Sequence, residues 1–145
     1  MRYIYYDRRS TTDIARQSYE RAQKKSSKWR HNMISISSDV IRGYNDTMIL
    51  YLLLKEPSYG YEISRQIRLM SRDKYIIKET TLYSAFARME KNGFVRSYSE
   101  NAENGKRRTY YCITDEGRQY YRDKCEEWTL TKEVIEHFID GKRGE

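Results

Sequence analysis

The stretch that decides the fold is KETTLYSAFARMEKNGFV at positions 78–95, followed ten residues further on by GKRRTYYCIT at 105–114. In the first stretch, Leu82, Phe86 and Met89 recur at i, i+4 and i+7, which places them on one face of a helix. The second stretch opens with a glycine and three consecutive cations, and continues with residues that favour strands. The pattern therefore predicts a helix with one apolar face, followed by a β-hairpin whose tip is basic.

The opposite side of this predicted helix is polar and basic. Thr81, Ser84, Arg88 and Lys91 recur at i, i+3, i+7 and i+10, with no acidic residue among the four. Asn92-Gly93 ends the helix, because glycine readily adopts the left-handed conformation of a helix C-cap. A helix that can enter a DNA groove, with a basic wing beside it, predicts a winged-helix DNA-binding domain. Taken alone, the helix cations are better explained by solubility and by the helix dipole, and those of the hairpin could form an ordinary charged turn. Taken together with Thr81, Ser84 and the wing, the helix cations favour DNA contact.

The residues before this unit predict two more helices. The first is expected at about 40–55, with an N-cap among residues 37–39 and with Pro57 ending it. Its expected buried stripe consists of Ile41, Tyr44, Met48, Tyr51 and Leu52. The second helix is expected at about 59–71, with Ser58 as its cap. Its expected core face consists of Ile63, Ile67 and Met70.

The residues after the unit predict the hairpin and one long helix. Strands are expected at 94–99 and 107–113, joined by a turn at Asn104-Gly105. Thr114 is expected to cap a last helix that extends over about 115–140. The predicted fold class is therefore mainly α with a small β-hairpin, a winged helix-turn-helix followed by a long C-terminal helix.

The last helix carries an apolar stripe that is too long for a small three-helix core to cover. Its members are Tyr121, Cys125, Trp128, Ile135, Phe138 and Ile139. Such a stripe indicates a partner helix, most simply from a second copy of the chain, so a homodimer is expected. The chain accordingly divides into an N-terminal extension at 1–32, a winged-helix DNA-binding domain at 33–114 and a dimerisation helix at 115–145.

The formal net charge of +7 is concentrated in residues 1–32, which hold nine Lys or Arg and three acidic residues. Two interpretations stay open for this very polar segment. It is either a basic arm that lies along phosphate, or a solvated extension that is flexible, non-native or upstream of a start at Met33. A basic isoelectric point by itself is weak evidence for nucleic-acid binding, so local clustering has to support that function.

No group of residues indicates catalysis, a metal or a cofactor. The two histidines and two cysteines lack metal-ligand spacing, and reduced thiols are favoured over a disulfide between Cys112 and Cys125. No nucleophile–base pair or glycine-rich phosphate loop is recognisable. Without an apolar run of about 20 residues or a secretory signal, a cytoplasmic protein that is not an enzyme is expected. The rival class is a protein-interaction module whose basic face binds an acidic partner.

Four segments, in order, resemble the PadR family of bacterial transcriptional regulators. They are ILYLLLKEPSYGYEIS at 49–64, ETTLYSAFARMEKNGFV at 79–95, GKRRTYYCITDEGRQYY at 105–121 and EEW at 126–128. Because a second C-terminal domain is lacking, the chain is similar to the short subfamily, which includes drug-responsive repressors. The resemblance implies a homodimer on a palindromic double-stranded DNA operator, with the third helix of each copy in a major groove and the wings on flanking DNA.

The resemblance also implies roles for single residues. Tyr83 matches a tyrosine that faces the DNA backbone, although it could equally pack at the edge of the core. Trp128 matches a tryptophan in the dimer-centre cavity, where planar aromatic effectors stack in drug-binding members. Many members have Gly and Pro where this chain has Thr80 and Ser84, which leaves the base preference open. Together with the outward helix face, the candidate DNA-binding residues are Tyr59, Thr80, Thr81, Tyr83, Ser84, Arg88, Lys106 and Arg107.

Overall fold

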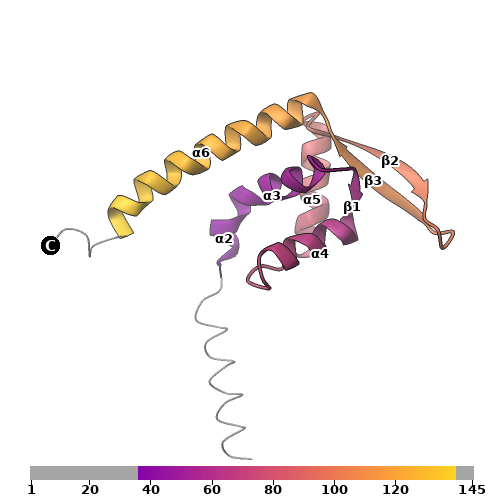
Figure 1. The fold of residues 1–145 in the computed structure, drawn as a ribbon, viewed down its shortest axis with the longest axis horizontal. Helices are drawn as coiled ribbons and strands as arrows, with labels where there is room; N and C mark the ends of the chain where they lie inside the picture. The colour runs from indigo at the N-terminus through magenta and orange to yellow at the C-terminus, as the bar shows by residue number, and fades with distance from the viewer. Residues whose placement is uncertain (1–35, 140–145) are drawn as a thin grey trace, which may run out of the picture. The chain divides into compact units, whose positions relative to one another are not determined.

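The computed structural model describes residues 36–139, so the predicted extension at 1–32 lies outside the described residues. The elements, in chain order, are α2 (Ser38–Ile41), the 3-10 helix η1 (Arg42–Tyr44), α3 (Asn45–Leu53), β1 (Ser58–Tyr59), α4 (Gly60–Met70), α5 (Glu79–Lys91), β2 (Val95–Asn101), β3 (Arg107–Ile113) and α6 (Asp115–Ile139) (Figure 1). The strands form an antiparallel sheet in the order β1-β3-β2. This mainly helical fold, with a hairpin and a long final helix, confirms the predicted winged helix-turn-helix.

The core lies between α3, α4, α5 and the inner face of the sheet. Leu82, Phe86 and Met89 are all buried, as their spacing predicts. The Phe86 ring stacks on Tyr111 of β3, with ring centroids 3.8 Å apart and planes 5° apart. Loss of a buried phenylalanine ring costs about 3–5 kcal/mol. This packing fixes which face of α5 is turned inward, and therefore which face is left to solvent.

The first predicted helix is interrupted, and of its predicted buried stripe only Leu52 lies in the core, with Met48 packed partly against it. Ser37 caps α2 by accepting a hydrogen bond from the Val40 amide at 3.3 Å, and η1 then separates α2 from α3. The buried residues of α3 are Asn45, Ile49, Leu50, Leu52 and Leu53. Tyr44 and Tyr51 meet aromatic rings of α6 instead. This segment has two apolar sides, and its periodicity alone did not show which one faces the core.

The second predicted helix begins later than expected. Ser58 does not cap it, because Ser58 and Tyr59 form the short strand β1, which pairs with Tyr111 and Tyr110 of β3. The free edge of β3 offers backbone hydrogen bonds that the local sequence does not reveal, so this third strand was missed. Met70, predicted to be buried, is 54% exposed.

The hairpin and the start of α6 follow the predicted signals. Gly93 and Gly105 adopt φ values of 77° and 76°, as expected for the helix stop and for the turn. The Thr114 hydroxyl accepts a hydrogen bond from the Gly117 amide at 3.0 Å and donates one to the Gly93 carbonyl at 2.6 Å. The cap of α6 is therefore also bonded to the C-terminal end of α5, and the direction of α6 is tied to that of α5.

Beyond its first turns, α6 extends past the rest of the described chain (Figure 1). Its exposed apolar residues are Trp128, Leu130, Val134, Ile135, Phe138 and Ile139. None of the described helices is both long enough and apolar enough to cross a bilayer.

Candidate nucleic-acid interface

The solvent side of α5 is the centre of the candidate interface. Thr80, Ser84, Ala87 and Lys91 are all exposed and recur at i, i+4, i+7 and i+11, which is one line along a helix. Ala87 was missed from the sequence, although its spacing from Thr80 could have identified it. This line contains two hydroxyls, a methyl group and an ammonium, and these are groups that can contact base edges and phosphates.

Two predicted contact residues of α5 are turned away from this line and towards α3. Arg88 forms an ion pair with Asp46 of α3, whose side chain is only 13% exposed. Thr81 is half-buried and lines a cavity together with Asn45. Arg88, predicted to point outward, is exposed, but its charge is paired with that of the Asp46 carboxylate. Contact between Arg88 and DNA stays a prediction.

Three of the predicted residues line one groove of about 400 Å³ beside the sheet: Tyr59, Tyr83 and Arg107. Tyr83 is 49% exposed, and its ring meets Phe86 edge-to-face at 6.1 Å. Its hydroxyl lies close over the start of α4, since a Cβ on Gly60 would be 3.1 Å from that oxygen. Tyr83 is thus a packing residue that remains half-exposed, and its contact with the DNA backbone stays a prediction.

The outer face of the sheet carries a row of tyrosines across its three strands. Tyr59 pairs with Tyr110, which in turn pairs with Tyr98, and the Tyr98 and Tyr110 rings are stacked at 5.7 Å. The Arg108 guanidinium lies 4.5 Å from the centre of the Tyr59 ring, a cation–π contact that holds it on the sheet. The row therefore stiffens the hairpin and removes Arg108 from the free cations at its tip.

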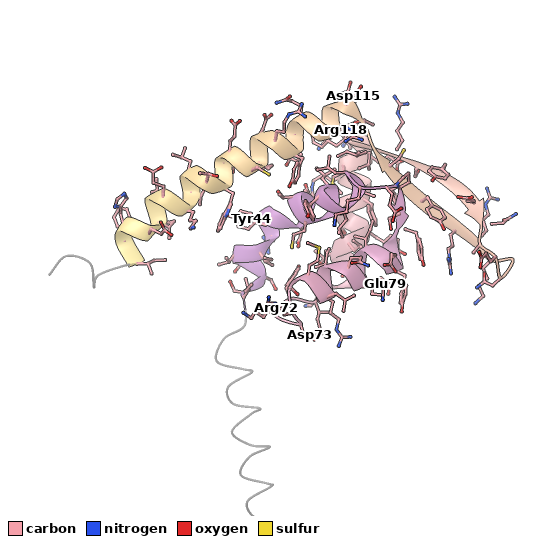
Figure 2. All side chains as sticks on the ribbon, in the orientation of Figure 1. Tyr44, Arg72, Asp73, Glu79, Asp115 and Arg118 are labelled. Atoms are coloured by element: carbon pink, nitrogen blue, oxygen red, sulfur yellow. The ribbon has the colours of Figure 1, made fainter. Side chains whose placement is uncertain are left out.

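The hairpin tip presents the remaining cations. Lys106 and Arg107 are both exposed, and nitrogen-bearing side chains project from this end of the hairpin (Figure 2). The side-chain Oδ1 of Asn104 accepts a hydrogen bond from the Lys106 backbone amide at 3.1 Å, which stabilises the turn. The tip is therefore an ordered basic element next to the groove, as its sequence predicts.

The predicted interface residues of α6 divide into two groups. Tyr121 and Cys125 are half-buried, and the Tyr121 ring lies 6.3 Å from that of Tyr51 in the same chain. Burial, with a hydrogen bond to Cys125, raises the pKa of Tyr121 to about 12. Trp128 is 48% exposed and meets Tyr44 edge-to-face at 5.1 Å.

The first two residues of the stripe thus pack within the chain, and the exposed ones begin at Trp128. Among the described residues, no group of three or more His, Cys, Asp or Glu could hold a metal ion. Cys112 and Cys125 are both free thiols.

Known proteins share this arrangement. Residues 49–123 match the PadR-like family of transcriptional regulators. An uncharacterized protein of Lysinibacillus sphaericus is 41% identical over 106 residues, which is 73% of this chain and 97% of that protein. The structure of a transcriptional regulator from Clostridium thermocellum is 63% identical, with a TM-score of 0.67 over 72% of this chain and 98% of that one. A PadR family transcription regulator from hypervirulent Clostridium difficile is 39% identical, with a TM-score of 0.58 over 66% and 98% of the two chains.

The matched segment contains every element of the candidate interface: α5, the groove beside the sheet, the hairpin and the start of α6. The described surface presents hydroxyls, tyrosine rings and cations, which are groups that can contact DNA. The chain belongs to the PadR-like family of transcriptional regulators, and it is a DNA-binding regulator and not an enzyme.

Proposed function

We propose that the protein is a homodimeric repressor in the cytoplasm that binds a palindromic operator. The α5 helix of each copy enters a major groove, and the β2–β3 hairpin contacts the backbone beside it. The observation that carries this proposal is the exposed line of Thr80, Ser84, Ala87 and Lys91 next to a basic hairpin tip. Phosphate contacts supply most of the salt-sensitive affinity, and the α5 line supplies base discrimination.

The exposed apolar end of α6 supports the dimer. Val134, Ile135, Phe138 and Ile139 are 46% to 83% exposed, and a second copy of the same helix would remove this surface from water. A twofold arrangement gives two α5 helices that read two half-sites of opposite orientation. The distance between them then depends on how the two α6 helices pack.

The same region supports a small-molecule effector. Trp128 is half-exposed, and Tyr44 contacts it edge-on, so aromatic surface stays open between two α6 helices. A planar aromatic molecule stacked there would change the helix spacing and hence the separation of the two α5 helices. Loss of one half-site would cost several kcal/mol of operator affinity, because each half-site supplies its own base contacts.

The test is fluorescence anisotropy of a labelled duplex from upstream of the protein's own gene, titrated at several salt concentrations beside a scrambled duplex. Tight binding with preference for the native sequence is expected, and it should weaken steeply with salt. The Lys106→Ala/Arg107→Ala variant should bind with a log K against log salt slope that is smaller by about 1.8 for each copy bound, or about 3.6 for the dimer, since each lost phosphate contact removes about 0.9. Equal, weak binding of both duplexes would contradict the proposal and favour an acidic protein partner for the basic face.

A further inference from the structure

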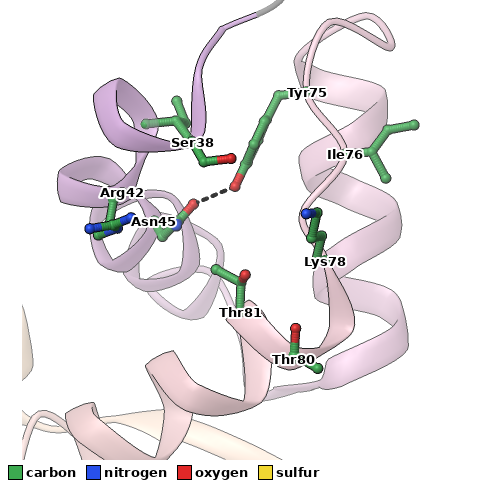
Figure 3. A pocket seen from close by; sticks show the side chains of 9 residues that line it. Ser38, Arg42, Asn45, Tyr75, Ile76, Lys78, Thr80 and Thr81 are labelled. Atoms are coloured by element: carbon green, nitrogen blue, oxygen red, sulfur yellow. Dashed lines mark hydrogen bonds between the residues drawn. The ribbon is translucent and has the colours of Figure 1, made fainter.

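Three consecutive residues, at the point where η1 gives way to α3, each contact a different part of the chain. The Tyr44 ring meets Trp128 of α6 edge-to-face, with ring centroids 5.1 Å apart. The Asn45 side-chain oxygen accepts a hydrogen bond from the hydroxyl of Tyr75, in the loop between α4 and α5, at 2.8 Å (Figure 3). The third residue, Asp46, forms an ion pair with an arginine of α5. The start of α3 therefore contacts α6, the α4–α5 loop and α5 at once.

The ion pair between Asp46 and Arg88 joins the two side chains at two points. Nε of Arg88 lies 3.4 Å from one carboxylate oxygen of Asp46, and a terminal nitrogen of the same guanidinium donates to the other oxygen. The Asp46 side chain is nearly buried. A guanidinium held at two points by a carboxylate is fixed in direction as well as in distance, whereas hydrophobic burial is not directional. The pair therefore adds a fixed direction between α3 and α5.

The Asp46 carboxylate also acts on α6. The Lys124 ammonium donates a hydrogen bond to Glu127 at 2.6 Å, and this bond is the main cause that raises the pKa of Lys124. The charge of Asp46 acts on Lys124 in the same direction. The ammonium lies 5.6 Å from the centre of the Tyr120 ring, which stacks on Phe94, just after α5, at 4.2 Å. Asp46 thus lies within electrostatic reach of both α5 and α6.

The C-terminal end of α5 is attached to α6 separately. The Thr114 hydroxyl, which caps α6, donates to the Gly93 carbonyl at 2.6 Å, and the Thr114 amide donates to the Phe94 carbonyl at 3.0 Å. A second fixed contact is therefore needed to set the direction in which α5 leaves this junction. With its 13 residues, α5 is about 20 Å long, so a rotation of roughly 10° about this end would displace its first turn by about 3.5 Å. That displacement is close to the rise of one base pair, about 3.4 Å.

We propose that Asp46 is a positioning residue for DNA recognition: its two-point bond to Arg88 holds α5 at one orientation relative to α6, and thereby sets the half-site spacing that the dimer binds. The proposal rests on the proposed function, a dimer joined through α6 that binds two half-sites. In such a dimer, the separation of the two α5 helices depends on the packing of α6 against α6 and on the orientation of α5 in each copy. Asp46 itself touches no DNA and acts through Arg88.

The test uses the full chain, the native duplex described above, and two duplexes with one base pair inserted or removed between the half-sites. Fluorescence anisotropy gives the ratio of the affinities for native and altered spacing. A smaller folded fraction lowers all the affinities of one protein sample equally, so a loss of stability alone leaves this ratio unchanged. The wild type should prefer the native spacing. Asp46→Asn should reduce that preference by roughly fivefold, the lower end of the usual coupling between linked sites.

Two further variants separate the geometry of the pair from its charge. Asp39→Asn is the matched control, because Asp39 is an exposed aspartate of α2 that pairs with Arg42 of η1, and it should leave the preference unchanged. Arg88→Lys keeps the charge but cannot bond a carboxylate at two points, so it should reduce the preference as Asp46→Asn does. The double variant of Asp46→Asn with Arg88→Lys should have no larger effect than either change alone, because one contact is lost in each case.

The outcomes distinguish this inference from the proposed function. If Asp46→Asn or Arg88→Lys keeps the wild-type preference, Asp46 does not position α5, although operator binding itself stands. If Asp46→Asn binds every duplex more tightly and with a larger salt slope, Asp46 restrains a contact between Arg88 and phosphate, and the positioning role is overturned. If circular dichroism shows that Asp46→Asn is unfolded, Arg88→Lys alone decides the question. If the wild type binds none of the duplexes, the proposed function is refuted, and this inference with it.

Discussion

Replacement of Gly117 by alanine should test how α6 is positioned on the winged helix. Gly117 is the only described residue of α6 that is buried, and it lies directly against the loop that follows α5. A Cβ at this position would be 2.1 Å from the Phe94 carbonyl oxygen and 2.9 Å from Cγ1 of Ile113. The nearest atom belongs to the backbone, so no side-chain rotation can relieve the clash.

The magnitude follows from two opposing effects. Forcing an extra carbon into a packed site costs about 1–3 kcal/mol, and a clash with backbone should fall at the upper end of that range. Alanine is favoured over glycine in a helix interior by about 1 kcal/mol, which offsets part of the cost. We expect a net loss of about 2 kcal/mol in the free energy of unfolding, or about 8 °C in melting temperature for a domain of this size.

The assay is urea denaturation followed by circular dichroism, at one fixed protein concentration because a dimer is expected. Gly43→Ala is the control, since a Cβ there would meet no atom within 4 Å and the residue is exposed. That variant should be as stable as the wild type or slightly more stable, because alanine reduces the freedom of the unfolded chain. If Gly117→Ala unfolded at the same urea concentration as the wild type, the close contact between α6 and the Phe94 loop would be refuted.

Two further predictions follow from the contacts of α5 and α6. Arg88→Gln should destabilise the domain by about 1–3 kcal/mol in urea denaturation, because it leaves the nearly buried Asp46 carboxylate without its ion-pair partner. The control, Lys91→Gln, changes an exposed residue of the same helix and should leave the stability unchanged. Equal stability of the two variants would show that the ion pair contributes nothing. Planar aromatic cations should quench the fluorescence of Trp128 in a saturable way. A Trp128→Phe variant, which retains Trp29, should lose that response. Quenching that persists in this variant, or no quenching across a broad panel of compounds, would rule out the effector site.

Much of the fold could be predicted because its signals are local. The Leu82, Phe86 and Met89 spacing identified the inner face of α5, and Gly93 and Gly105 marked the stop and the turn that they form. Such signals act within a few residues, through helix geometry and backbone conformation, so one sequence is enough to show them. The basic hairpin tip followed in the same way from the Lys106-Arg107 pair.

Features that depend on distant residues could not be predicted in this way. Strand β1 exists because Tyr59 reaches the free edge of β3, about fifty positions away. The ion pair of Arg88 depends on Asp46, and the cavity that faces Lys78 depends on Asn45, which precedes it by more than thirty positions. Sequence periodicity shows which side of a helix is polar, but not which neighbour covers part of that side.

The sequence by itself thus determined the order of elements, the inward face of α5 and the basic tip of the hairpin, because helix period, caps and turns are properties of neighbouring residues. Tertiary structure alone decided that Arg88 is paired with Asp46. It also decided that the stripe of α6 is free only from Trp128 onwards. The physical reason is the same in each case: ion pairing and burial depend on the packing of segments that the chain brings together only when it folds.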